Sequence, residues 1–474
     1  MDHSEQTRQL EHARIRVLLL KYSAPAILGT VVNATYNIVD RIFIGQTIGD
    51  IGLTAATLSF PAMMIFNGFA MMVGIGSSVL ISIKLGEKNN EDAEKILGQA
   101  LFLFFSISVI FGGLGLYFLE PILYSFSATE AAMPLAKEFL GIILLGVFFQ
   151  TISFGVNSFI RAEGQPRIAM ITMIMSAIVN TFLAWLFLCV FRTGIWGAAL
   201  ATVLAQAFCS VWIIALYLSG RTLLKIRPHF IRLNMPLARR IFMLGLPAFM
   251  MQLVGSVLQI LQNHQLRYYG ELYGKLHGFE RGADISIAVM GILFSVFMLF
   301  LMPLLGIGQG MQPIVGYNIG ANKMDRVART LTLGLFGGFA FSVVCLGIIS
   351  FFPDTFMSLF IKSDSPDRVE IIALGTRALR LCMLMLPGVG IVVILTNYFQ
   401  SSGRPGWSLL LTFVRQVFIL VPLLLVLPIL LNKTEGFSGL DGIWLAVPIS
   451  DFGALVLAVI FLVIEYRRLY SRQR

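Results

Sequence analysis

The chain has 474 residues, of which 57% are hydrophobic and only 13% are charged, and its mean hydropathy is +0.83. Soluble domains carry roughly 25% charged residues, so this composition excludes a water-soluble globular protein. The net charge of +10 does not indicate a nucleic-acid partner, because no soluble fold is there to present a basic patch. The sequence instead predicts membrane-spanning helices of about 20 residues or more.

Twelve apolar runs follow one another along the chain, each bounded by charged or turn-forming residues. They cover residues 18–46, 51–83, 96–120, 133–160, 167–192, 195–219, 237–268, 284–317, 327–351, 372–401, 405–431 and 442–466. A basic segment at 221–239 separates the first six runs from the last six. We therefore predict an all-α polytopic membrane protein with two six-helix lobes, residues 1–220 and 240–474, joined by a cytoplasmic linker at 221–239.

The two halves repeat each other. Residues 74–95 resemble residues 306–329, RAEGQP at 161–166 pairs with QSSGRP at 400–405, and GIWGA at 194–198 pairs with GIWLA at 442–446. Because each half holds an even number of spans, both halves insert in the same direction. The lobes should then be related by a pseudo-two-fold axis along the membrane normal, an arrangement typical of transporters. The repeated GIG motifs favour close helix packing over nucleotide binding.

Most lysine and arginine residues fall in alternate loops when the amino terminus is placed inside the cell. The positive-inside rule therefore predicts that both termini are cytoplasmic and that the basic loops attract anionic lipids of the membrane. The first apolar run is too long for the core of a signal peptide, so we expect an uncleaved amino terminus.

The first run carries the most informative polar groups. Asn33, Asn37 and Asp40 are spaced so that they form one stripe of a helix, and Pro25 interrupts the helix's hydrogen bonding near its inner end. A carboxyl at this depth costs about 2.5–3.5 kcal/mol on insertion scales, so Asp40 must face protein or water. It is a candidate to bind a proton or Na⁺ in exchange for a substrate. The alternative is structural pairing, with the adjacent Arg41 or with a neighbouring helix.

Other polar groups inside the runs have two open readings, as parts of a substrate cavity or as helix-to-helix hydrogen bonds. These candidates are Asn157, Asn180, Thr202, Gln206, Gln252, Gln259, Asn397 and Tyr398. Asp451 in the last run is either functional or simply buried. We find no nucleotide-hydrolase loop, no Ser-His-Asp pattern and no metal-ligand spacing. We therefore expect no enzyme activity, no cofactor and no metal site, and an ion gradient as the source of energy.

The duplicated six-span halves, Pro25, the NIVDRIFIG sequence at 37–45 and the LGEKNN and IGANKM loops resemble the multidrug and toxic compound extrusion (MATE) family, most of all its MepA-like bacterial branch. The resemblance implies two lobes around a V-shaped cavity and drug export driven by H⁺ or Na⁺. It assigns the family's coupling acid to Asp40, its proline to Pro25, its asparagine to Asn180 and its threonine to Thr202. The DinF-like branch has a second acid where this chain has Ala184. The acids that some NorM-like members carry in spans seven and ten are also absent.

From the residues and this resemblance together we expect a monomeric antiporter of the bacterial inner membrane. It should export bulky organic cations in exchange for H⁺, or Na⁺, by alternating access, with Phe and Met side chains lining an adaptable cavity. A flippase for lipid-linked oligosaccharides of similar fold is the alternative. Such a protein needs cationic groups for a pyrophosphate, and the span interiors offer only Arg41 and Arg415.

Overall fold

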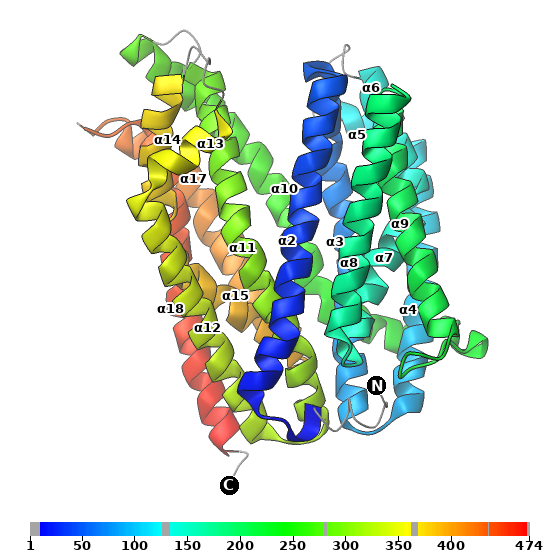
Figure 1. Ribbon diagram of the computed structural model, residues 1–474. Helices are drawn as coiled ribbons and strands as arrows, with labels where there is room; N and C mark the ends of the chain where they lie inside the picture. The colour runs from blue at the N-terminus through cyan, green and yellow to red at the C-terminus, as the bar shows by residue number, and fades with distance from the viewer. Residues whose placement is uncertain (1–9, 126–132, 279–281, 362–367, 435, 472–474) are drawn as a thin grey trace. The chain divides into compact units, whose positions relative to one another are not determined.

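The computed structural model describes residues 10–125, 133–278, 282–361, 368–434 and 436–471, and these contain helices and loops but no strand (Figure 1). The helices of the first half are α2 Ile15–Thr47, α3 Asp50–Gly86, α4 Asn90–Tyr117, α5 Leu119–Ser125, α6 Met133–Leu145, α7 Val147–Ala162, α8 Pro166–Ala184, η1 Trp185–Val190 and α9 Ile195–Leu218. After the short η2 Pro228–Phe230, the second half contains α10 Met235–His277, α11 Gly282–Gly320, α12 Met324–Phe351, α13 Pro353–Phe360, α14 Arg368–Cys382, α15 Leu386–Ser401, α16 Pro405–Phe413, η3 Val414–Leu420, α17 Val421–Leu431 and α18 Gly439–Ser471.

Ten described spans are long and apolar enough to cross a membrane, and two bent pairs of helices pass the same test when each pair is taken together. The pairs are α6 with α7, bent by 54°, and α14 with α15, bent by 52°. If each pair is one span the total is up to twelve, in the order of the twelve predicted apolar runs. The predicted all-α polytopic fold is thereby confirmed.

The structure adds breaks that the apolar runs do not reveal. The bend between α6 and α7 falls at Gly146, where an added Cβ would lie 2.4 Å from the side chain of Val203, so only glycine allows α9 to approach here. The fifth and eleventh runs each contain a π-helical stretch, η1 and η3, at corresponding places in the two halves. Such stretches are rare and occur frequently at functional sites.

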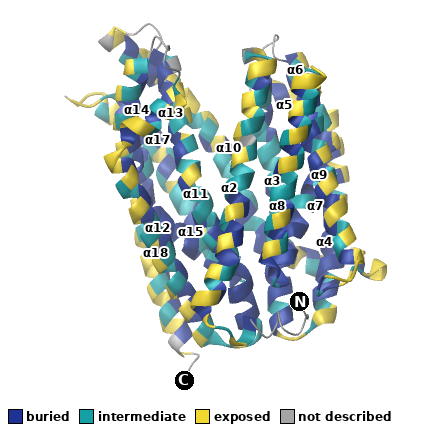
Figure 2. Cartoon of the chain, viewed as in Figure 1, coloured by how far each residue is buried: buried dark blue, intermediate teal, exposed yellow. Residues whose placement is uncertain are grey.

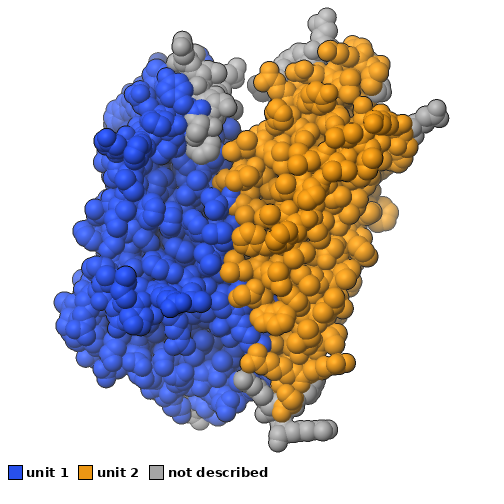
Figure 3. Space-filling model, turned by 180° about the vertical axis from the view of Figure 1, so that it is seen from behind, with its two compact units in different colours: residues 1–253, 309–330, 398–405 blue, residues 254–308, 331–397, 406–474 orange. Residues whose placement is uncertain are grey.

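By its internal contacts the chain forms two compact units (Figure 3). Unit 1 comprises residues 1–253, 309–330 and 398–405, and unit 2 comprises 254–308, 331–397 and 406–474. These units differ from the predicted lobes, because three segments of the second half belong to unit 1. The lobe boundaries at 220 and 240 stay a prediction, although α10 already begins at Met235, inside the predicted linker.

Each unit has its own apolar core. In unit 1 one cluster is built around the fully buried Leu123 and Leu140 from α5 and α6, and in unit 2 a cluster surrounds Leu266, Ile349 and Trp444. Many other large apolar side chains are exposed along the helices, as Figure 2 shows by their colour. Exposed Leu, Ile and Phe on long helices are the pattern expected of surfaces that face lipid.

Close helix packing explains the repeated glycines. In unit 1 an added Cβ at Gly76 would lie 2.1 Å from the carbonyl oxygen of Ile241, and one at Gly86 would lie 2.0 Å from that of Tyr317. A Cβ at Gly320, in the second copy of the motif, would lie 2.0 Å from the carbonyl oxygen of Ile83. No side chain fits at these distances, so the prediction that the glycines serve helix packing is confirmed.

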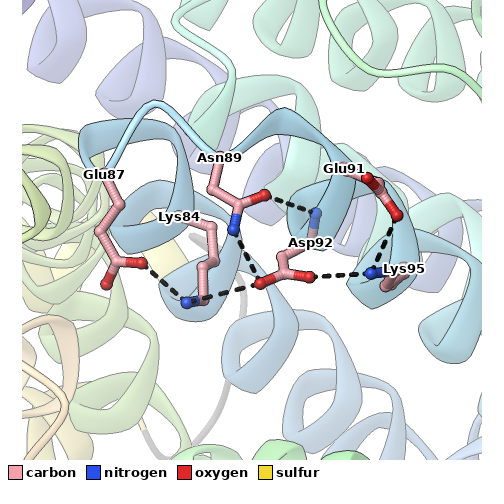
Figure 4. Close-up of polar contacts among 6 residues, drawn as sticks. All are labelled: Lys84, Glu87, Asn89, Glu91, Asp92 and Lys95. Atoms are coloured by element: carbon pink, nitrogen blue, oxygen red, sulfur yellow. Dashed lines mark hydrogen bonds and ion pairs between the residues drawn. The ribbon is translucent and has the colours of Figure 1, made fainter.

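The loop between α3 and α4 is organised by charged side chains (Figure 4). The Asn89 side chain caps α4 by accepting a hydrogen bond from the Asp92 backbone N–H over 3.0 Å. Lys84 pairs with Glu87 at 2.7 Å and Lys95 pairs with Asp92 at 3.1 Å. These contacts fix where α3 ends and α4 begins.

Candidate functional site

Three polar side chains from three helices meet inside unit 1: Asp40 on α2, Asn180 on α8 and Thr202 on α9. The Thr202 hydroxyl donates a hydrogen bond to Asp40 Oδ2 over 3.3 Å, and Asn180 Nδ2 donates to Thr202 Oγ1 over 3.3 Å. Asn180 and Thr202 are buried, with 2% and 8% of their surface exposed. The structure therefore brings together the three residues proposed to couple an ion, while that role itself stays a prediction.

The neighbouring helices hold this group in place from both sides. Along α2 and α8, which pack side by side, an added Cβ at Gly29 would lie 2.8 Å from the sulfur of Met173. Gly29 lies eleven residues before Asp40, about three helical turns, and so on nearly the same face of α2. The missing side chain at Gly29 thus lets α8 lie close enough for Asn180 to reach the Asp40 cluster.

The Thr202 hydroxyl has two acceptors within reach. It lies 3.2 Å from the carbonyl oxygen of Ala198 in its own helix and 3.3 Å from Asp40. One hydroxyl has a single hydrogen to donate, so it serves one acceptor at a time. Thr202 can therefore release Asp40 when the carboxyl changes its proton or ion, without being left unbonded.

Two oxygen atoms of the group are buried without a hydrogen-bond partner, Asp40 Oδ1 and Asn180 Oδ1. Leaving such an atom unsatisfied costs about 1–3 kcal/mol, so this arrangement calls for a function. A carboxylate oxygen and an amide oxygen are both acceptors, and they suit a proton or a small cation.

Asp40 makes no ion pair within the described part of the chain. The guanidinium of the adjacent Arg41 instead lies over the ring of Phe60, 5.3 Å from its centre. Adjacent residues on a helix point about 100° apart, which explains why Arg41 does not turn back to the carboxyl. The structural alternative of an Asp40–Arg41 pair is therefore not what the side chains form.

The second acid inside a span, Asp451 on α18, is in a different situation. Its Oδ1 lies 2.8 Å from Nε of Arg415 in the π-helical stretch η3, and the two side chains are 4% and 20% exposed. Of the two readings left open for Asp451, this geometry favours a buried structural pair. The sequence named both residues but gave no reason to join them, because they come from different helices.

The other predicted residues are not gathered at one place by the described contacts. Asn157 bridges α7 and α8, donating to the carbonyl oxygen of Ala169 over 2.9 Å and accepting from Arg161. Asn397 donates to Val393 one turn back in its own helix. Gln206 and Tyr398 are buried, whereas Asn33, Gln252 and Gln259 are partly exposed. Pro25 lies inside α2, and the side chain of Asn37 lies outside the described residues.

Sequence reasoning missed two buried acids near the ends of the spans. Glu94 and Glu163 are 5% and 2% exposed, and both hold the backbone of the segment that follows α9. Their only signal in the sequence is an acid placed beside a basic loop. Among the described residues no group of three or more His, Cys, Asp or Glu side chains is arranged to hold a metal.

Comparisons with known proteins agree with this architecture. A family model described as MatE matches residues 25–186 and 280–426. Multidrug export protein MepA of Staphylococcus aureus is 24% identical over 98% of this chain and 97% of its own length, and MepA of Staphylococcus haemolyticus is 24% identical over 93% and 92%.

Solved structures match over nearly the full length. The MATE multidrug transporter DinF-BH, solved in complex with a small-molecule ligand, is 33% identical with a TM-score of 0.84 over 96% of both chains. An outward-facing multidrug resistance MATE family transporter of the MOP superfamily gives a TM-score of 0.87 over 98% of both chains. It is 23% identical, so this second likeness concerns the fold alone.

Proposed function

The chain belongs to the MatE family of transporters, and from that premise we propose that it exports bulky organic cations in exchange for an ion that binds at Asp40. The observation that carries the proposal is the Asp40 group: a carboxyl inside a span, without an ion pair in the described part of the chain, with one buried oxygen that has no partner. An acid kept in this state is costly and therefore points to transport rather than to stability.

The exchanged ion is H⁺ in this proposal, with Na⁺ as the alternative. One carboxylate with a hydroxyl and an amide beside it is enough to take up and release a proton. A hard metal cation prefers six or more oxygen ligands, as Ca²⁺ and Mg²⁺ do, and this site offers few. Thr202 and Asn180 would steady the ionised carboxylate by hydrogen bonding, directly and through the Thr202 hydroxyl.

The exported substrate would be a flat or bulky organic cation. The MepA relatives are named multidrug export proteins, and the DinF-BH structure is that of a multidrug transporter with a bound compound. Aromatic faces attract a cation by about 0.5–2 kcal/mol, and methionine adapts to different shapes. Candidate substrate contacts are the polar residues of the spans other than the coupling group: Asn33, Asn37, Asn157, Gln206, Gln252, Gln259, Asn397 and Tyr398.

The cycle would proceed by alternating access in a monomer of the bacterial inner membrane with both termini in the cytoplasm. The halves 1–220 and 240–474 would rock against each other, and Pro25 would let α2 bend as Asp40 exchanges its ion. The flippase alternative finds less support, because Arg415 is occupied by Asp451 and Arg41 lies over Phe60.

Replacing Asp40 by Asn tests the proposal. The amide keeps the size and the hydrogen-bonding capacity of the carboxyl but cannot take up or release a proton in the physiological range. In inverted membrane vesicles we expect Asp40→Asn to lose ethidium transport driven by a pH gradient while its expression and folding stay normal. Glu138→Gln, the same change at an exposed position, is the control and should transport normally. Transport by Asp40→Asn at the wild-type rate would refute the assignment.

A parallel measurement separates the two ions. Vesicles with an imposed Na⁺ gradient and no pH gradient should show no uptake if H⁺ is the coupling ion. Uptake driven by Na⁺ alone would assign the site to Na⁺ instead. Selective transport of anionic lipid-linked pyrophosphates, with no transport of ethidium, would favour the flippase.

A further inference from the structure

The segment that joins α9 to α10 is strongly basic. Residues 221–240 contain six Lys or Arg residues and no acid, and only the short η2 interrupts the loop before α10 begins at Met235. The sequence predicted a linker here. The structure shows a segment held firmly against unit 1, and we call residues 221–234 the strap.

Two buried side chains at the end of α7 fix the first part of the strap. Glu163 accepts hydrogen bonds from the backbone N–H groups of Leu223, over 2.9 Å, and Leu224, over 3.3 Å. Gln165 donates its side-chain amide to the carbonyl oxygen of Arg221 over 3.2 Å. Contacts to the backbone hold the path of the chain whichever side chains it carries.

Helix α4 fixes the second part of the strap. Glu94 accepts from the backbone N–H of Lys225 over 3.2 Å and pairs with Arg227, and Gln99 accepts from the backbone N–H of Asn234 over 2.7 Å. Phe230, 9% exposed, packs against α4 at Gly98, where an added Cβ would lie 2.7 Å from the Phe230 carbonyl group. The strap is therefore ordered in advance, without the entropy cost that a flexible loop meets on binding.

Beyond these anchors the chain turns apolar and basic side chains outward. Ile231, Leu233 and Met235 are 40%, 50% and 68% exposed. Arg232 alternates with them and is exposed as well, and this part of the loop is coloured as exposed in Figure 2. Neighbouring apolar side chains exposed together mark an interaction surface.

The start of α10 adds two arginines in an unusual place. Arg239 and Arg240 are exposed, lie near the amino-terminal end of α10, and make no ion pair with an acid in the described part of the chain. No acid stands in the first turn of α10. Cations are unfavourable at this end of a helix, where the backbone N–H groups attract anions. An anion from outside the chain would satisfy both features.

We propose that Ile231, Leu233 and Met235 together with Arg232, Arg239 and Arg240 form a preformed binding surface for anionic phospholipids of the membrane. The arginines bind the phosphate groups, and the apolar side chains enter the boundary between headgroups and acyl chains. The occupant is a lipid because the surface runs directly into α10, a membrane-spanning helix, and because it combines positive charge with exposed apolar groups.

Lipid retention tests the charged half of the surface. The purified full-length protein is exchanged into nanodiscs holding equal parts phosphatidylglycerol and phosphatidylcholine, and the co-purifying lipid is counted by native mass spectrometry. Arg232→Gln/Arg239→Gln/Arg240→Gln should lower the preference for phosphatidylglycerol by roughly fivefold for each arginine. Replacing the same three residues by Lys should largely restore it, which a folding defect would not allow.

A matched variant separates this surface from net charge. Arg192→Gln/Arg267→Gln/Lys433→Gln removes three exposed basic groups from other loops and helix ends, and it should retain phosphatidylglycerol as the wild type does. An equal loss in both triple variants, or no loss in the first, would overturn the proposal.

Probe accessibility tests the apolar half without removing any charge. Leu233→Cys is spin-labelled in a Cys189→Ser background, which removes the one exposed cysteine among the described residues. In the same nanodiscs the label should be accessible to oxygen, which dissolves in lipid, and protected from a water-soluble nickel reagent. Free access for the nickel reagent would show that the surface faces water and serves a soluble acidic partner instead.

Discussion

Removing the positive partner of Asp451 should destabilise the protein more than removing both charges. The pair is buried, with side chains 20% and 4% exposed and 2.8 Å between Arg415 Nε and Asp451 Oδ1. In Arg415→Met the carboxyl stays in an apolar environment without its partner, a change that costs about 3–5 kcal/mol. The lower end applies here, because Arg415 is partly exposed. In Arg415→Met/Asp451→Leu no charge remains, and such replacements are often neutral or stabilising.

Thermal unfolding of the purified protein in detergent, followed by intrinsic fluorescence, measures the difference. A domain of 150–250 residues loses about 2–4 °C in Tm for each kcal/mol, and unit 2 falls in this size range. Arg415→Met should therefore unfold on the order of 10 °C below wild type, and the double variant close to wild type. Lys433→Met, at an exposed position, is the control. If the single variant unfolds at the wild-type temperature, or the double variant falls as far as the single one, the pair does not stabilise unit 2 as described.

Three further outcomes follow from the Asp40 group and its surroundings. Pro25→Ala should slow ethidium efflux in vesicles more than it weakens ethidium binding in detergent, because the proline is expected to permit bending of α2 rather than to contact the drug; equal loss of both would make it a packing residue. Ethidium or tetraphenylphosphonium affinity, expected near micromolar or about −8 kcal/mol, should weaken from pH 8 to pH 5 in wild type, because drug and proton compete for Asp40. The same titration should be flat in Asp40→Asn, and a flat wild-type curve would remove the competition. Burial raises the pKa of Glu163 to about 7, although hydrogen bonds from Tyr217 and the strap lower it in part. The folded protein then holds this proton more tightly than the unfolded chain, so its stabilising contribution is fully present below pH 4.5 and is lost as the pH rises through about 7. The Tm of wild type should fall over that window more steeply than the Tm of Glu163→Gln, and parallel curves would show that Glu163 does not titrate there.

The sequence by itself determined the solvent, the class of fold and the leading residue of the site. Apolar runs of membrane-spanning length cannot be absorbed by a soluble core, so composition alone led to the all-α polytopic fold. A lone acid in an otherwise apolar run is expensive wherever it faces, so Asp40 could be selected without a structure. The internal repeat was visible because its glycines and loop motifs recur in order along both halves.

Only the tertiary structure decided which polar groups are partners. Asp40, Asn180 and Thr202 are distant in sequence, and hydrogen bonds between separate helices depend on how those helices rotate and pack. The same reason explains Asp451, whose pairing with Arg415 no periodicity indicates, and Asn157, which bridges two helices. The strap shows the limit most clearly. Its charge marked it as a loop, but buried carboxyls on other helices hold its backbone, and backbone contacts leave no pattern in the sequence that makes them.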